Sequence, residues 1–189
     1  MASTITVQSH QVLERVLSIE IVRVTERAAV SAAGLSIDVR GGGEIAHDQL
    51  ASLSVAARER FGLAGNPRLI LLEFPLWGWP LGFARDCARL LAEGVVVLVA
   101  HPERNADVQE DPTHVREIVE AGAYVQLTAA SVDGRLGKRP AGCSAELLRL
   151  GLAHVITGTF SPTEVAMTIV VGVASLIGIA VCLRARSGM

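Results

Sequence analysis

Short apolar runs and amphipathic segments alternate through the middle of the chain. Runs of the kind that form buried strands occupy residues 35–39, 68–72, 95–100, 123–128 and 154–157. The segments between them carry apolar residues at helical spacing and lie at 46–61, 81–93, 114–121 and 144–150. Strands that alternate with helices predict an α/β fold with parallel strands, arranged as part of a β/α barrel.

Polar side chains follow the first three predicted strands. Glu44, Glu73 and His101 are 29 and 28 residues apart, a spacing that fits one strand, one covering helix and two loops. We therefore expect the three side chains to converge on one face. Two carboxylates and one imidazole suit a divalent metal such as Mn²⁺, Zn²⁺ or Fe²⁺, which can polarise a phosphoryl oxygen. The alternative is that His101 is a loop histidine whose hydrogen bonds are made within the protein, beside a surface ion pair.

Several motifs resemble the bacterial capsule-associated protein-tyrosine phosphatases of the polymerase-and-histidinol-phosphatase (PHP) superfamily. They lie at 42–45, 72–75, 100–105, 122–131 and 134–137, and the resemblance covers about residues 36–158. It implies a manganese-dependent phosphotyrosine phosphatase on a distorted β/α barrel, tied to exopolysaccharide and capsule control. On this resemblance Glu44, Glu73 and His101 are metal ligands, and Arg104 is the catalytic residue that helps to bind phosphate. The implied partner is a phosphotyrosine protein substrate, for example a polysaccharide-biosynthesis kinase.

The chain departs from that family at two places. No His-x-His motif precedes Glu44, and Thr159 and Ser161 stand where the family has an aspartate and a histidine. Neither threonine nor serine is a good ligand for a transition metal, so we expect impaired turnover. The alternative function is a catalytically inactive, membrane-tethered module that binds phosphate or another protein.

The two ends differ from the middle. Residues 9–33 have the pattern of one amphipathic helix, and they resemble the opening helix of class II fructose bisphosphatases, so a fused fragment related to that family is a further alternative. Residues 165–183 contain no charged residue and are long enough to span a bilayer. We thus expect an N-terminal helix (1–34), a partial phosphatase domain (35–160) and a transmembrane segment with a short tail (161–189). The domain is expected to be cytoplasmic and anchored by the C-terminal helix.

Composition narrows the function classes. The formal net charge is −2, from 17 basic and 19 acidic residues, and no basic run indicates nucleic-acid binding. The remaining candidates have bland interpretations: buried thiols (Cys87, Cys143 and Cys182), structural histidines (His47, His114 and His154), a tight glycine turn (41–43) and a solvated cationic loop (133–140). Trp77 and Trp79 could form an aromatic wall at a substrate entrance, or pack a loop against the barrel rim.

Overall fold

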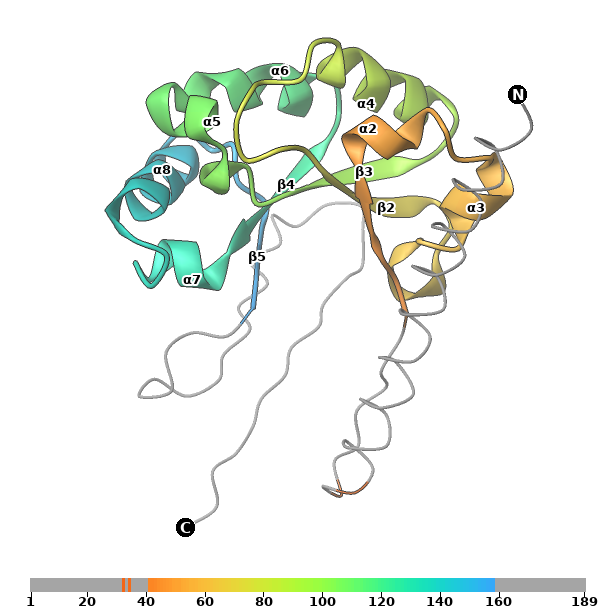
Figure 1. The fold of residues 1–189 in the computed structure, drawn as a ribbon, viewed down its shortest axis with the longest axis horizontal. Coiled ribbons are helices and arrows are strands. Elements are labelled where there is room, and N and C mark those ends of the chain that lie inside the picture. Colours follow the sequence, from red (N-terminus) through yellow and green to blue (C-terminus); the bar gives the residue numbers. More distant parts are fainter. Residues whose placement is uncertain (1–31, 33, 35–40, 159–189) are drawn as a thin grey trace, which may run out of the picture. The chain divides into compact units, whose positions relative to one another are not determined.

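The structure is a computed structural model that describes residues 32, 34 and 41–158. The chain forms two compact units, Met1–Leu71 and Leu72–Met189. Its fold is mixed α/β with one five-stranded sheet in the order β1-β2-β3-β4-β5 (Figure 1). The strands are β1 (Glu44–Ala46), β2 (Leu69–Glu73), β3 (Val96–Ala100), β4 (Tyr124–Thr128) and β5 (Val155–Thr157). β3 pairs with β4 and β4 with β5 in parallel, which confirms the predicted α/β class.

The segment after β1 corrects one prediction. Instead of a single helix over 46–61, it forms α2 (His47–Leu50), α3 (Val55–Glu59) and the 3₁₀ helix η1 (Leu63–Gly65). The Ser52 hydroxyl donates to the Gln49 carbonyl at 2.7 Å, and the Ser54 hydroxyl accepts from the Ala57 amide at 3.2 Å as the N-cap of α3. Serine side chains that bond nearby backbone groups compete with helix continuation, so the helix breaks there.

Helices α4 (Phe83–Ala92) and α6 (Val115–Glu120) contact each other and cover one face of β3 and β4 (Figure 1). Phe83, Cys87 and Leu90 are at most 1% exposed and follow one another at helical spacing, as the apolar pattern predicts. The helix ends just before Gly94, whose φ of 76° is the left-handed conformation expected of a glycine after a helix.

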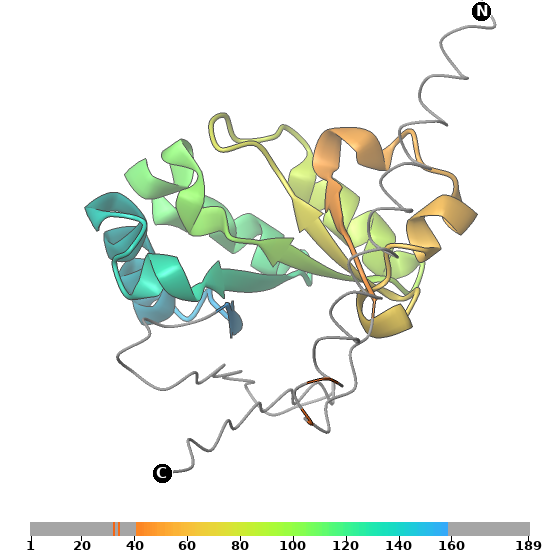
Figure 2. The same cartoon turned by 60° about the horizontal axis from the view of Figure 1, so that its bottom comes forward.

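Two further helices, α5 (Ala106–Glu110) and α8 (Lys138–Arg149), pack with the 3₁₀ helices η2 (Pro102–Arg104) and η3 (Pro112–His114), and α7 (Ala129–Val132) packs with α8 and β4. Figure 2 shows α7 and α8 together beside the end of β4. The predicted loop 133–140 is confirmed for residues 133–137, but its last three residues are helical and the predicted helix start at residue 144 is wrong, because α8 begins at Lys138. Pro140 is compatible with this start, since in the first turn of a helix the backbone N–H has no intrahelical partner to lose.

The predicted terminal segments fall outside this description. The amphipathic helix over 9–33, except for residue 32, and the apolar segment 165–183 lie among the residues that the structure does not describe. Of the helices that it does describe, none has the length and apolar character needed to cross a membrane. Both segments therefore stay predictions.

Candidate metal centre

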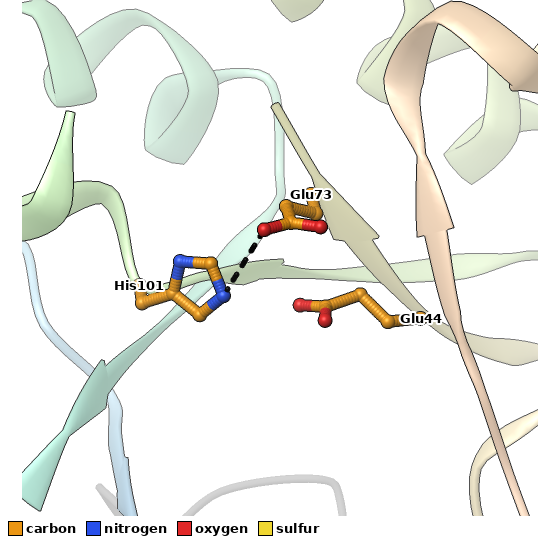
Figure 3. A group of neighbouring side chains, drawn as sticks. All are labelled: Glu44, Glu73 and His101. Atoms are coloured by element: carbon orange, nitrogen blue, oxygen red, sulfur yellow. Dashed lines mark ion pairs between the residues drawn. The ribbon is translucent and has the colours of Figure 1, made fainter. Parts of the chain in front are cut away.

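Glu73 and His101 lie at the carboxyl ends of neighbouring strands in the sheet. Glu73 is the last residue of β2, and His101 directly follows β3. The Nε2 atom of His101 lies 3.6 Å from the Oε1 atom of Glu73 (Figure 3). The His101 side chain is 13% exposed and that of Glu73 is 37% exposed, so the pair is partly withdrawn from solvent. The strand-end positions predicted from the sequence are confirmed for both residues.

Glu44, the third predicted ligand, is the first residue of β1 and is exposed. The strand predicted over 35–39 lies outside the described residues and stays a prediction, whereas Glu44 itself begins a strand. Glu44, Glu73 and His101 each offer one ligand atom, and these atoms lie within 4.8 Å of one another (Figure 3). A candidate metal-binding group of two carboxylates and an imidazole is therefore present.

The donor set fits a divalent ion. At 3.6 Å, the His101–Glu73 separation is longer than an imidazole–carboxylate hydrogen bond. Two ligand atoms that are each about 2.1 Å from one ion lie about 3 to 3.5 Å apart, which is close to the observed separation. Carboxylate oxygen and imidazole nitrogen are ligands that Mn²⁺, Zn²⁺ and Fe²⁺ accept. The residues present thus suit the metal that the sequence predicts.

A glycine segment (41–43) precedes Glu44. The Gly43 amide donates to the Phe61 carbonyl at 3.0 Å, and the Gly65 amide donates to the Gly41 carbonyl at 3.1 Å. A Cβ atom at Gly42 would lie only 3.0 Å from the Leu63 Cα atom. The missing side chain lets the backbone of residues 61–65 approach this segment closely, but residues 41–43 do not form the predicted tight turn.

The backbone turns sharply at His101. Its φ and ψ angles are 35° and 53°, a left-handed conformation that side-chain-bearing residues rarely adopt. The Arg104 amide donates to the His101 carbonyl at 3.0 Å, which closes the turn into η2. Strain of this kind is found where the surrounding structure holds a residue in place, and here it occurs at a predicted metal ligand.

Arg104, the predicted phosphate-binding residue, ends η2 and is half-buried. Its guanidinium makes no ion pair with any residue in the part of the chain that the structure describes. Glu103, one residue earlier, is fully buried, and its Oε1 accepts from the Thr128 amide at 2.9 Å. The alternative interpretation placed a surface ion pair beside His101. Because Glu103 is buried, it does not form such a pair.

Burial raises the pKa of the Glu103 carboxyl. The hydrogen bond from the Thr128 amide acts in the opposite direction, because a hydrogen bond to a carboxylate favours its charged form. Glu103 thus connects the turn after β3 to the end of β4 through a buried hydrogen bond.

Asn105 ends the motif 100–105, but no role was predicted for it from the sequence. It is 2% exposed, and its Oδ1 accepts from the Asp107 and Val108 amides at 2.9 and 3.1 Å as the N-cap of α5. Its Nδ2 donates to the Pro75 and Gly78 carbonyls at 2.7 and 3.2 Å. One side chain therefore joins the loop after Glu73 to the turn after His101. An asparagine just before a helix is a capping signal, but its partners at 75 and 78 could not be read from the sequence.

Of the two tryptophans, Trp79 has the packing role, and an aromatic wall at a substrate entrance stays a prediction for Trp77. The Trp79 ring packs edge-on against Phe74, with centroids 5.3 Å apart, stacks on His114 at 5.4 Å and donates a hydrogen bond to Glu117. Trp79 is thus a packing residue of its loop, whereas Trp77 is 74% exposed. His114 is structural, as expected.

A family model described as "Capsular polysaccharide synthesis, CpsB/CapC" matches residues 4–163. The chain belongs to the CpsB/CapC family. Because the match includes all of residues 9–33, an origin of that segment in a fructose bisphosphatase is not favoured.

Two curated relatives are similar to this CpsB/CapC chain. It is 31% identical over 119 residues to the tyrosine-protein phosphatase YwqE of Bacillus subtilis (strain 168), a match that covers 63% of the chain and 44% of YwqE. It is 32% identical over 89 residues to CapC of Staphylococcus aureus, which bears the name of a tyrosine-protein phosphatase, a match that covers 47% of the chain and 35% of CapC. These matches span less than half the length of either relative.

A solved structure is also similar to the chain, with a TM-score of 0.62 and 26% identity over 75% of this chain and 57% of the other. It comes from the crystal structures of YwqE from Bacillus subtilis and CpsB from Streptococcus pneumoniae, which are described as metal-dependent tyrosine phosphatases. The similarity supports the PHP-like fold that the resemblance implied.

Proposed function

We propose that this chain is a metal-dependent phosphotyrosine phosphatase that acts in capsule or exopolysaccharide biogenesis. The observation that carries the proposal is the group of Glu44, Glu73 and His101, found in a member of the CpsB/CapC family. The names of YwqE and CapC support phosphotyrosine in a protein as the substrate class. A polysaccharide-biosynthesis kinase that carries phosphotyrosine fits this proposal.

In this proposal Glu44, Glu73 and His101 hold the metal, and Mn²⁺ is the ion that we favour. When bound, such an ion polarises a phosphoryl oxygen and makes a coordinated water more acidic. The half-buried Arg104 guanidinium binds two phosphate oxygens as a fork and stabilises the charge that builds up on them. Its lack of an ion pair in the described part of the chain supports this role, since no carboxylate there competes with the phosphate.

The experiment is hydrolysis of a phosphotyrosine peptide after removal of metals with EDTA and titration with Mn²⁺. Glu73→Gln and His101→Ala are each expected to lower kcat/KM by about 100-fold or more and to raise the Mn²⁺ concentration that gives half-maximal rate. Glu120→Gln, a change of the same chemistry at an exposed glutamate of α6, is the matched control and should behave as the wild type. Equal background rates in the wild type and both ligand variants would refute the proposal.

Arg104 and the choice of metal are tested in the same assay. Arg104→Ala is expected to weaken competitive inhibition by inorganic phosphate and to leave the Mn²⁺ affinity unchanged, because this side chain binds the anion and not the ion. Replacing Mn²⁺ by Zn²⁺, Fe²⁺ or Mg²⁺ at equal occupancy ranks the metals. A higher rate with any of the others would contradict the assignment of Mn²⁺ but not that of the site.

A further inference from the structure

The side chain of Gln126, the middle residue of β4, links three neighbouring strands of the sheet. It belongs to β4, where it pairs with Ala100 of β3 and Val155 of β5, and it is 4% exposed. Its Oε1 accepts from the His101 backbone N–H at 3.1 Å. Its Nε2 donates to the Leu127 carbonyl and to the Thr157 hydroxyl, each at 2.7 Å. One amide thus joins the backbone of the predicted metal ligand to the ends of β4 and β5.

These contacts determine the orientation of the Gln126 amide. The group on the side of His101 is a donor, and the two groups on the other side, the Leu127 carbonyl and the Thr157 hydroxyl, can both accept. Only the orientation with the oxygen toward His101 satisfies all three hydrogen bonds. A buried amide whose hydrogen bonds are made holds its neighbours firmly, because any rearrangement would leave polar groups unpaired.

His101 needs such support. Its left-handed backbone, with φ at 35°, is unfavourable for a residue with a side chain. The direction of its Cα–Cβ bond, and so the position of its imidazole, follows from this backbone conformation. The backbone of His101 is held on both sides: its N–H donates to Gln126, and its carbonyl accepts from the Arg104 amide.

We propose that Gln126 is a positioning residue that holds the His101 backbone in the conformation that directs the imidazole toward Glu73. The inference rests on the proposed function in one respect, namely that His101 is a metal ligand. The competing explanation is that Gln126 only fills space and satisfies hydrogen bonds in the sheet.

Two substitutions in the same hydrogen-bond group separate these explanations. Gln126→Met keeps the length of the side chain and removes the acceptor for the His101 N–H. Thr157→Val removes a hydrogen bond of the same amide on the side away from His101, and the Leu127 carbonyl still orients the amide. A purely structural role predicts similar effects of both changes. A positioning role predicts that only the loss of the acceptor affects His101.

Two readouts are taken on the metal-free protein by NMR: the hydrogen-exchange rate of the His101 amide and the chemical shifts of its imidazole. Gln126→Met is expected to speed exchange by about tenfold or more and to shift the ring signals, because the amide loses its partner. Thr157→Val should leave both unchanged. The third readout is Mn²⁺ affinity by calorimetry, which Gln126→Met should weaken by about 10- to 100-fold while Thr157→Val changes it little.

Unchanged His101 signals in Gln126→Met, or equal effects of the two variants, would overturn the proposal. Gln126→Asn serves if the methionine variant does not fold, since its shorter amide cannot span from His101 to Thr157, and it should affect the same readouts in the same direction. A wild type that does not bind Mn²⁺ would instead count against the proposed function. The two metal-free readouts would then still decide the role of Gln126.

Discussion

Single polar side chains at the candidate metal centre hold backbone segments that are distant in sequence. Asn105 connects residues 75 and 78 to the start of α5, and Gln126 connects His101 to Thr157. Such side chains are buried, so each of their hydrogen bonds replaces one that water would otherwise make. Their loss leaves unpaired backbone groups in the interior, and the effect should therefore exceed that of a surface substitution.

Asn105→Ala is expected to lower the free energy of unfolding by about 2 to 3 kcal/mol, because it removes the N-cap of α5 together with two buried hydrogen bonds. Urea unfolding followed by circular dichroism measures the change. Asn105→Asp separates the two halves of the amide: it keeps the capping oxygen but places a carboxylate oxygen against the Pro75 and Gly78 carbonyls, so a loss at least as large is expected at neutral pH. An unfolding curve for Asn105→Ala that coincides with that of the wild type would show that these bonds contribute nothing.

Glu73 and His101 could be predicted from the sequence, whereas Gln126 and Asn105 could not. A polar residue at the end of an apolar run is visible in the sequence, and the end of a buried strand is a usual place for functional groups. Gln126 also interrupts an apolar run, but its partners lie 25 and 31 residues away. A hydrogen-bond partner that distant is set by the pairing of β3, β4 and β5, not by local spacing.

Among the secondary-structure elements, β4 and β5 are joined by a histidine. The His154 amide donates to the Val125 carbonyl at 2.9 Å, and the Val125 amide donates to the Nδ1 atom of His154 at 3.1 Å. Burial lowers the pKa of His154. The neutral ring is therefore the form that accepts the Val125 hydrogen bond and fits the folded sheet.

This arrangement predicts a pH dependence of stability. An unfolded histidine titrates near 6.5, above the lowered pKa of folded His154, so between these two values the unfolded state binds more protons. The contribution of His154 is fully present above about pH 6.5 and is lost as the pH falls toward the pKa of the folded state. Urea unfolding at about pH 7.5 and pH 5.5 should show a smaller loss of stability for His154→Gln, which does not titrate, than for the wild type. Equal losses would contradict this role.

Helix ends were harder to predict than helices. The spacing of Phe83, Cys87 and Leu90 correctly predicted the buried face of α4, because that face depends only on helical geometry. The break between α2 and α3 and the early start of α8 depend on serine hydrogen bonds and on where Pro140 lies within its helix. Serine and proline occur in both loops and first turns, so the sequence pattern alone does not distinguish these cases.

At the scale of the whole molecule, the reactivity of two buried thiols can be used to measure unfolding of the unit Leu72–Met189. Cys87 on α4 and Cys143 on α8 are both buried, and burial raises the pKa of each to about 12. The thiolate is the reactive form, so both sulfurs are protected by lack of access and by protonation. This agrees with the predicted buried thiols for these two residues, whereas Cys182 lies outside the described part of the chain.

Iodoacetamide should therefore leave Cys87 and Cys143 unmodified in the native protein at neutral pH and alkylate both in urea. Mass spectrometry of the two cysteine-containing peptides measures each site separately. If the unit Leu72–Met189 opens cooperatively, the two cysteines gain reactivity at the same urea concentration. Rapid alkylation of either cysteine without denaturant would contradict the burial of that thiol.

The sequence by itself determined the α/β class, the order of the strands along the chain, the buried face of α4 and the residue types for a divalent metal at strand ends. Each follows from local spacing, because strand and helix periods and the ends of apolar runs can be read residue by residue. Only the tertiary structure decided that Glu103 is buried, that His101 is left-handed, and that Gln126 and Asn105 hold the turns after Glu73 and His101. These features depend on contacts between segments that the chain brings together only when the sheet forms.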